Sequence, residues 1–364
     1  MAPASLVLLV LFTAAPAPPP SVGEVLRAQC RAGAADPRNP WALAHGMVLD
    51  GRSFKASDGR LAADVIIADF LHREGEGLQA DLRFEPFAAN GTPVEPHPNL
   101  LLKTLLLAGY TPAHVFRARW GPVTVGALEE DLKRDFRLGA ALSPQGAWTL
   151  DALSHALPAQ ASFTNGVGDT FRVDEVMDEA LALLEREQAE LMAGMKAGLA
   201  QVPKRKQGIY AHPCGGLHLF QAVAGHARHP AIRAAWGPRL EAQLDVLFYR
   251  LGSESRQYDD ALASAPPAYR LPVLVQMLKF YGHFLETLGR YREDTGWRPT
   301  PVQAQQVQQA LALLDGAVRR LEAAGAWRDL QVLKAAQYQL YLDLVGDTCH
   351  AARGWSYWSS ARRG

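Results

Sequence analysis

The densest group of reactive side chains lies in residues 212–218, which read His-Pro-Cys-Gly-Gly-Leu-His. Thiolate and imidazole are the ligands that zinc prefers, and Cys214 and His218 would lie one helical turn apart if a helix begins early in this segment. The segment therefore suits metal binding or nucleophilic chemistry. A structural alternative stays open, in which the two glycines allow close backbone approach and both reactive side chains pack in the core.

Four other stretches place polar residues in helices that are otherwise apolar. These residues are Trp41 with His45, His97 with Asn99, His283 with Glu286, and Cys349 with His350. Burying such groups without a partner costs on the order of a few kcal/mol, so we expect them to line a central cavity. The spacing of three between His283 and Glu286 lets a carboxylate orient an imidazole. Taken singly, each histidine also fits a structural role with satisfied hydrogen bonds.

These segments define the candidate site. We assign acid–base catalysis to His45, His218, His283 and Glu286. We assign ligand binding to Trp41, His97 and Cys214. The cofactor is either absent or a zinc ion, and the residues alone do not define which of them would bind it.

Recurrent catalytic motifs give no further guidance. The chain has no G-x-S-x-G, H-E-x-x-H, G-x-x-x-x-G-K-[ST] or G-x-G-x-x-G sequence. Asp259 and Asp260 are adjacent, and neighbouring residues on a helix diverge by about 100°, so a solvated helix end explains them better than a glycosidase pair.

The balance of charge argues against a nucleic-acid partner. The 364 residues include 37 Lys and Arg against 37 Asp and Glu, so the attraction to phosphates that dominates nucleic-acid binding is missing. With 48% hydrophobic residues the chain can bury a large core. We expect a small molecule or an envelope polymer as the ligand, and the oligomeric state stays open.

Apolar residues recur at helical spacing through most of the chain. Leu240, Leu244, Leu247 and Leu251 share one helix face, and a second apolar face runs from Val302 to Leu321 after a Thr-Pro start. Further helices are predicted at 22–32, 40–49, 61–72, 99–108, 125–136, 148–157, 174–199, 217–228, 272–288 and 330–345, with 174–199 the longest. Strand-like alternation occurs at 78–87 and 115–125, which predicts a small β-hairpin insert.

About a dozen helices joined by loops favour an all-α fold, an α/α toroid of about six helical hairpins. An open helical solenoid is the alternative, but no period of 20 to 50 residues supports regular repeats. Because no loop is long or charged enough to link domains, we predict one domain over 18–354 and a C-terminal tail over 355–364.

The N-terminal segment has the outline of a secretory signal peptide. Residues 6–13 are apolar, small residues close the run at 14–17, and the run is too short to cross a bilayer. We therefore predict a signal peptide over 1–17, export to the periplasm or the medium, and no transmembrane span in the mature chain; an uncleaved anchor is the alternative. Three cysteines are too few for a disulfide scaffold, and one must be unpaired if the other two bridge.

These motifs resemble those of uncharacterised bacterial α/α-toroid proteins, which are related in fold to terpenoid cyclases and prenyltransferase barrels. The similar pieces are Asn39-Pro40-Trp41 to His45-Gly46, His97-Pro98, Cys214 to His218, and Gly282-His283-x-x-Glu286. The resemblance implies a fold and no activity. The acidic and aromatic motifs of triterpene cyclases are absent.

A second resemblance is to the lanthionine synthetase cyclases, which are zinc α/α toroids. Ala-His-Gly, Cys-x-Gly and Cys-His-Gly follow one another in that family, and here Ala44-His45-Gly46, Cys214-Gly215-Gly216 and Cys349-His350-Ala351 appear in the same order. The resemblance implies that Cys214, Cys349 and His350 bind zinc and that His45 transfers protons. The third motif departs from the family, since Ala351 replaces glycine.

Three functions remain. The chain is an exported enzyme acting on an envelope glycan, lipid or peptide, a non-catalytic periplasmic binding or scaffolding domain, or a zinc-binding toroid. If the candidate residues converge on one pocket, the first and third functions are favoured. If the histidines are dispersed, a structural role is favoured.

Overall fold

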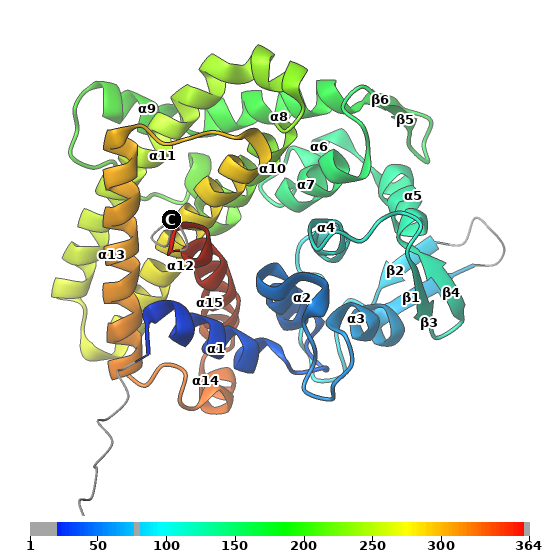
Figure 1. The fold of residues 1–364 in the computed structure, drawn as a ribbon, viewed down its shortest axis with the longest axis horizontal. Coiled ribbons are helices and arrows are strands. Elements are labelled where there is room, and N and C mark those ends of the chain that lie inside the picture. The colour runs from blue at the N-terminus through cyan, green and yellow to red at the C-terminus, as the bar shows by residue number, and fades with distance from the viewer. Residues whose placement is uncertain (1–19, 76–80, 360–364) are drawn as a thin grey trace, which may run out of the picture.

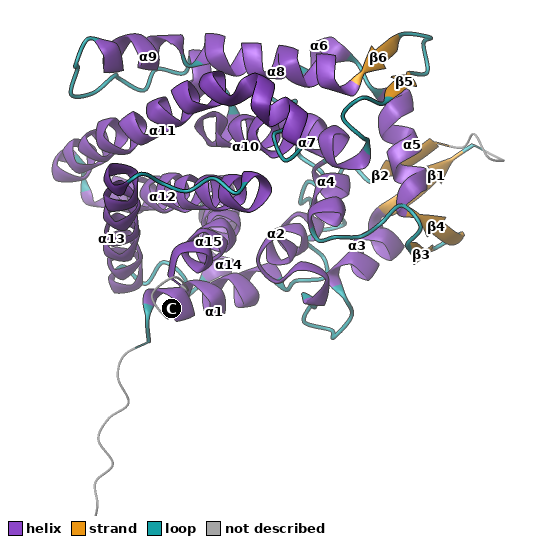
Figure 2. Cartoon of the chain, turned by 45° about the horizontal axis from the view of Figure 1, so that its top comes forward, coloured by secondary structure: helices purple, strands orange, loops and turns teal. Residues whose placement is uncertain are grey.

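The computed structural model describes residues 20–75 and 81–359. Over these residues the fold is all-α, and the strands in them form two-stranded hairpins (Figure 2). The predicted signal peptide, residues 1–17, and the last part of the predicted tail, residues 360–364, lie outside the described residues.

Six helices in the described part of the chain contact one another in a closed cycle that follows chain order (Figure 1). They are α2 (Pro40–Asp50), α4 (Leu100–Leu107), α7 (Ala147–Ala156), α10 (Leu217–His226), α12 (Pro267–Thr295) and α15 (Tyr338–Ser359). The last of them packs against the first, so the cycle closes without an open end.

A second group of helices surrounds this cycle and alternates with it along the chain (Figure 1). Each outer helix contacts at least one inner helix. The outer helices are α1 (Val22–Ala34), α3 (Ala62–Phe70), α5 (Val125–Asp135), α8 (Val173–Glu187), α11 (Pro230–Ser264) and α13 (Pro301–Ala323). Short helices lie in the connections, namely α6 (Leu138–Ala141), α9 (Ala189–Lys196) and α14 (Leu330–Ala336).

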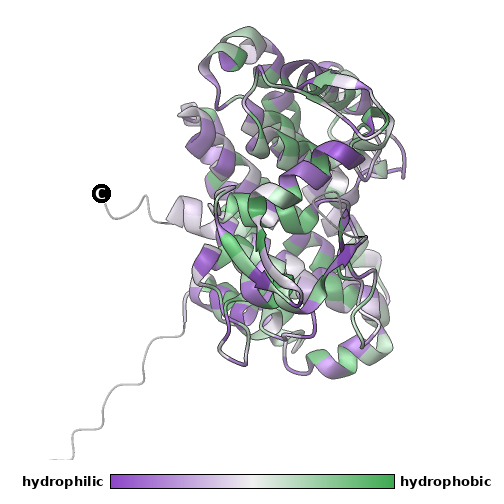
Figure 3. Cartoon of the chain, turned by 90° about the vertical axis from the view of Figure 1, so that its right-hand side faces the viewer, coloured by the Kyte–Doolittle hydropathy of each residue, from purple (hydrophilic) through white to green (hydrophobic). Residues whose placement is uncertain are grey.

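Helix α13 shows how local sequence sets an outer helix. Thr300 and Gln303 form a reciprocal capping box, and Pro301 occupies the first turn. The predicted apolar face is buried from Val307 to Leu321, while Val302 at its start is exposed. The same alternation of hydrophobic and hydrophilic residues runs along helices across the fold (Figure 3).

Two helix predictions were wrong in continuity. The segment 174–199 divides at Gln188 into α8 and α9, and α11, with 35 residues, is longer than either. The segment 330–345 divides at Gln337 into α14 and α15. The two parts differ in burial, because α14 buries no residue whereas α15 is buried against both α1 and α12.

The C-terminal aromatic residues belong to a helix. Helix α15 runs to Ser359, five residues beyond the predicted domain end at 354. The Trp358 indole Nε1–H donates to the Leu285 carbonyl oxygen at 2.9 Å, and Trp355 lies against Gly23 of α1. These contacts accompany a helix that extends into the segment predicted as a tail, as far as Ser359.

The predicted hairpin insert is present. Strands β1 (Leu71–Glu74) and β2 (Asp81–Phe84) pair antiparallel, as do β3 (Val115–Ala118) and β4 (Gly121–Thr124). A third hairpin of β5 (Ser162–Thr164) and β6 (Thr170–Arg172) was not predicted, since three-residue strands are too short to show alternation. Among the described residues, no helix is long and apolar enough to cross a membrane.

A disulfide joins Cys30 of α1 to Cys349 of α15, and both residues are fully buried. Cys214 is the free cysteine. This pairing corrects the zinc ligand set implied by the cyclase resemblance, because the Cys349 sulfur is bonded to another sulfur and is not a thiolate ligand.

Breaking the bridge by Cys30→Ala is expected to lower the free energy of unfolding by about 2–5 kcal/mol, because the bridge closes a very long loop of the unfolded chain. Thermal unfolding measures the loss. The matched control, Cys214→Ser, removes the free thiol and keeps the bridge. If the unsubstituted protein, unfolded in denaturant without reductant, shows three free thiols on titration, the pairing is contradicted.

Candidate functional site

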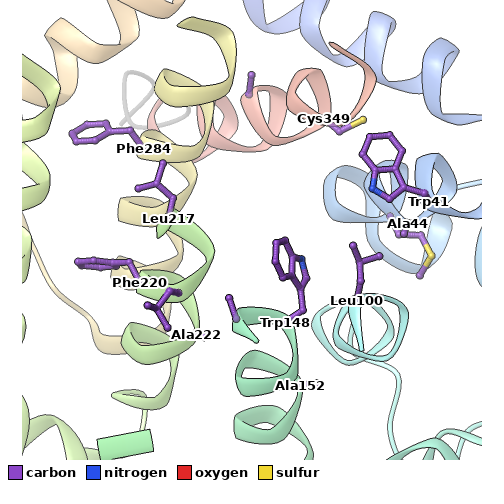
Figure 4. Close-up of a cluster of buried hydrophobic side chains, with 14 of the residues drawn as sticks. Trp41, Ala44, Leu100, Trp148, Ala152, Leu217, Phe220, Ala222, Phe284 and Cys349 are labelled. Atoms are coloured by element: carbon purple, nitrogen blue, oxygen red, sulfur yellow. The ribbon is translucent and has the colours of Figure 1, made fainter. Parts of the chain in front are cut away.

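The predicted site residues converge on one cavity of about 310 Å³. Its walls include six of the seven, namely Trp41, His45, His97, Cys214, His218 and His283. The seventh, Glu286, lies behind the wall, bonded to His350. Figure 4 shows Trp41 of α2, Leu100 of α4 and Trp148 of α7 extending into the space between the inner helices. The inner cycle therefore brings together residues that are hundreds of positions apart.

Two buried pairs connect α12 to α15. The Nε2–H of His283 donates to Oδ1 of Asp347 at 3.2 Å, and Nδ1–H of His350 donates to Oε2 of Glu286 at 2.7 Å. Glu286 was predicted to orient His283, but its oxygen is 3.6 Å from Nδ1 of that ring and closer to His350. Each carboxylate thus orients an imidazole of the opposite helix.

Glycines allow this close approach. A Cβ at Gly354 would lie 2.6 Å from the Gly282 carbonyl oxygen and 2.9 Å from the Glu286 nitrogen. A Cβ at Gly282 would lie 2.8 Å from the Cα of Ala351. Because these neighbours are backbone atoms, any side chain at either glycine would push the two helices apart.

Cys214 lies in a left-handed turn. It has φ 52°, and Gly215 and Gly216 continue the turn at φ 59° and 71°. The left-handed region costs a residue with a Cβ on the order of 1 kcal/mol, so the surrounding fold must hold Cys214 there. Helix α10 begins only at Leu217, so the turn and not a shared helix face brings the thiol near His218, contrary to the spacing argument.

The Cys214 sulfur faces two imidazoles. Sγ and one ring nitrogen each of His218 and His283 all lie within 4.8 Å of one another. Since Nε2 of His283 is bonded to Asp347, its Nδ1 is the atom left to exchange a proton with the thiol. The arrangement is thiol, imidazole and carboxylate in series, which is the pattern of nucleophilic catalysis.

Opposing effects act on the charge of His283. Burial lowers the pKa of His283, but the neighbouring Cys214 and the hydrogen-bonding interactions with Asp347 and Glu286 outweigh burial and hold that pKa well above its ordinary value. A raised pKa favours the protonated ring, which is the form that can serve as a general acid.

The neighbouring histidines are neutral. Burial lowers the pKa of His45 to about 3, and burial lowers the pKa of His350 to about 4 despite the Glu286 carboxylate. The His45 Nδ1–H donates to the Trp41 carbonyl oxygen at 2.7 Å, which leaves Nε2 as an acceptor at the cavity wall. The lowered pKa makes His45 a weak base, so its Nε2 is suited to accept a hydrogen bond from a ligand, and the predicted role in acid–base catalysis stays a prediction.

Aromatic rings form one side of the cavity. His97 stacks on Trp148 with centroids 3.7 Å apart and planes at 4°, and its Nδ1 is 2.8 Å from the Gln145 side-chain oxygen. His218 lies against the same indole at 4.6 Å. These three rings pack against one another and make this wall of the cavity aromatic.

A buried ionic network reaches Glu286 from three other inner helices. Arg290 forms two bonds of 3.1 Å to Asp151, and Lys103 lies 3.8 Å from the same carboxylate. Gln221 accepts from Arg290 at 3.0 Å and donates to Glu286 at 3.3 Å. Through Gln221, the network therefore holds the Glu286 carboxylate in position. Sequence reasoning missed it, because its members come from four different helices.

Two sets of side chains fit a metal ion. Cys214, His218 and His283 form one set, and His283, Glu286 and His350 form the other. Nδ1 of His218 and Nδ1 of His283 are buried without a hydrogen-bond partner among the described residues. A thiolate with two imidazoles suits zinc, and the Asp347 bond to His283 is the outer contact that zinc-binding histidines usually make.

A comparison with protein-family models, curated proteins and solved structures found no match to this chain. The site therefore rests on its own geometry. Sequence reasoning missed Asp347, Lys279 and Trp148, although the spacing of three between Asp347 and His350 on one helix was a usable signal.

Gly354→Ala is expected to destabilise the fold by about 1–3 kcal/mol through overpacking against the backbone of α12. Gly316→Ala is the matched control, because a Cβ there meets nothing within 4 Å and alanine favours a helix by up to about 1 kcal/mol. Urea unfolding of both variants measures the difference. Equal stability of the two variants would refute the close approach of α12 and α15.

Proposed function

We propose that this chain is an exported α/α-toroid enzyme that transfers or hydrolyses acyl groups through the thiol of Cys214. The observation that carries the proposal is the turn that holds Cys214 beside His283, whose other nitrogen is bonded to Asp347. The substrate class is an ester or amide of an envelope peptide or lipid.

The chemistry follows from the three side chains. The Cys214 sulfur attacks the carbonyl carbon and forms a thioester, and the bond to the leaving alcohol or amine breaks. His283 donates its Nδ1 proton to that leaving group, while Asp347 holds the ring in place. Water then attacks the thioester and gives one proton back to Nδ1 of His283, and the carbon–sulfur bond breaks to release the carboxylic acid and the Cys214 thiolate.

The architecture and the disulfide support the rest of the proposal. The closed cycle of inner helices with an alternating outer layer is what an α/α toroid of six hairpins requires. A disulfide between two buried cysteines is typical of proteins in oxidising compartments, in keeping with export guided by residues 1–17.

Cys214→Ser is expected to abolish hydrolysis of p-nitrophenyl acetate without changing the thermal unfolding midpoint. His283→Gln should slow the reaction by about 10²–10⁴-fold, since it removes the general acid. The control is His72→Gln in β1, which leaves the cavity intact. Intact mass should show one acetyl group on Cys214 in the native protein. An unlabelled Cys214 together with undiminished turnover in Cys214→Ser would refute thiol catalysis.

A zinc centre is the second candidate, favoured by the two unpartnered Nδ1 atoms beside the thiol. Such a centre predicts about one zinc per chain by elemental analysis, with loss of the metal in His218→Gln and protection of Cys214 from alkylation. The thiol enzyme predicts no bound zinc and full alkylation. The free-thiol function is excluded if stoichiometric zinc survives dialysis and its removal abolishes turnover.

A further inference from the structure

A second cavity, of about 280 Å³, lies on the other side of the Cys214 turn. Cys214 and Lys279 line both cavities, so the residue with the free thiol borders each of them. The remaining walls come from the segment 204–210 and from α11 and α12. Unlike the first cavity, this one contains no histidine in its lining.

Positive charge exceeds negative charge in this cavity. Its lining holds four cations, Lys204, Lys206, Arg250 and Lys279, against the single carboxylate of Glu254. Lys279 is directed to Asp343 and Asp347 of α15, at 3.1 and 3.6 Å. The other three cations therefore have only the Glu254 carboxylate to balance them within the lining of this cavity.

Glu254 is already engaged by two of these cations. Its Oε1 accepts from Arg250 Nε at 2.9 Å, and its Oε2 accepts from Lys204 Nζ at 2.8 Å. Arg250 is only 2% exposed, and its Nη2 lacks an aligned hydrogen bond to any described acceptor although it lies 2.8 Å from Oε1. A buried guanidinium with spare donor capacity favours an added anion.

The guanidinium lies next to the reactive turn. A Cβ on Gly215 would come within 2.8 Å of Arg250 Nη2, so the donor is adjacent to the residue that follows Cys214. Tyr210 and Phe280 flank the Arg250 head at 5.3 and 5.7 Å and hold it in place. The position of the charge relative to the sulfur is thus set by packing.

From these contacts we infer that the second cavity is an anion subsite. It binds a carboxylate or phosphate group of the acyl substrate and places the reacting carbonyl at Cys214. This inference rests on the proposed function for the role of the anion, while the binding of an anion beside the thiol stands by itself. Arg250 and Lys204 are the anchoring donors, and Lys206 adds charge at the exposed rim.

Alkylation of Cys214 tests the subsite, because the disulfide leaves one free thiol to label among the three cysteines. Iodoacetate and iodoacetamide both form a sulfur–carbon bond and release iodide, but only iodoacetate carries a carboxylate. Each rate is first divided by the rate of the same reagent with free cysteine. The normalised ratio of iodoacetate to iodoacetamide is then expected to be about ten or more, because the positive charge attracts the anionic reagent.

Variants assign the effect to this cavity. Lys206→Gln should lower the ratio by about two- to five-fold, the range expected for one exposed charge, and Gln276→Glu should lower it further. Lys55→Gln, an exposed lysine outside both cavities, should leave the ratio unchanged. Arg250 is left intact, since removing one member of a buried ion pair risks unfolding.

Competitors at constant ionic strength distinguish the two sources of the anion. If inorganic phosphate slows the labelling of Cys214 by iodoacetate more than acetate does, the substrate group is a phosphate. If acetate slows it more, the substrate group is a carboxylate. The subsite is overturned if the normalised ratio is one and neither Lys206→Gln nor Gln276→Glu changes it. Because labelling requires no turnover, loss of the acyl reaction with a high ratio retained would refute thiol catalysis and leave the subsite standing.

Discussion

The close contact between α12 and α15 is the constraint on which the site depends. Gly282 and Gly354 let the two backbones approach until an alanine at either position would overlap main-chain atoms. Only at that separation do His283 and Glu286 reach Asp347 and His350 across the interface. The disulfide attaches α15 to α1 as well. Its residue on α15, Cys349, lies between Asp347 and His350 in the sequence. The helix pair therefore serves as the rigid frame of the cavity.

Burying so many ionisable groups is unfavourable unless each one has a partner. The protein meets this requirement with alternating charge: His283 lies between Asp347 and Glu286, and beneath them Gln221 connects Glu286 to Arg290 and Asp151. At His45 and His350 burial is the larger effect and lowers the pKa, at His350 even beside the Glu286 carboxylate. The environments of this one cavity thus move imidazole pKa values in opposite directions, up at His283 and down at His45 and His350, which is a pattern of acid–base sites.

Cys214 occupies the boundary between two environments. On one side are the imidazoles and the Trp148 wall, and on the other are Arg250 and its neighbouring cations. The left-handed turn that places the sulfur there is unfavourable for a residue with a Cβ, and a Cβ on Gly216 would also overlap Ile209. Backbone strain at a residue with a reactive side chain is a feature of functional sites.

Local sequence determined the helical class, most helix starts and the chemical types in the site. Capping at Thr300, the leucine faces of α11 and the His-Pro-Cys-Gly-Gly segment act over a few residues, so they are visible in a linear chain. Tertiary structure alone decided that Cys349 pairs with Cys30, that Asp347 rather than Glu286 bonds His283, and that cations gather behind Cys214. The physical reason is range: capping and periodicity join near neighbours, whereas each of these contacts joins separate segments whose approach depends on how the whole ring of helices packs.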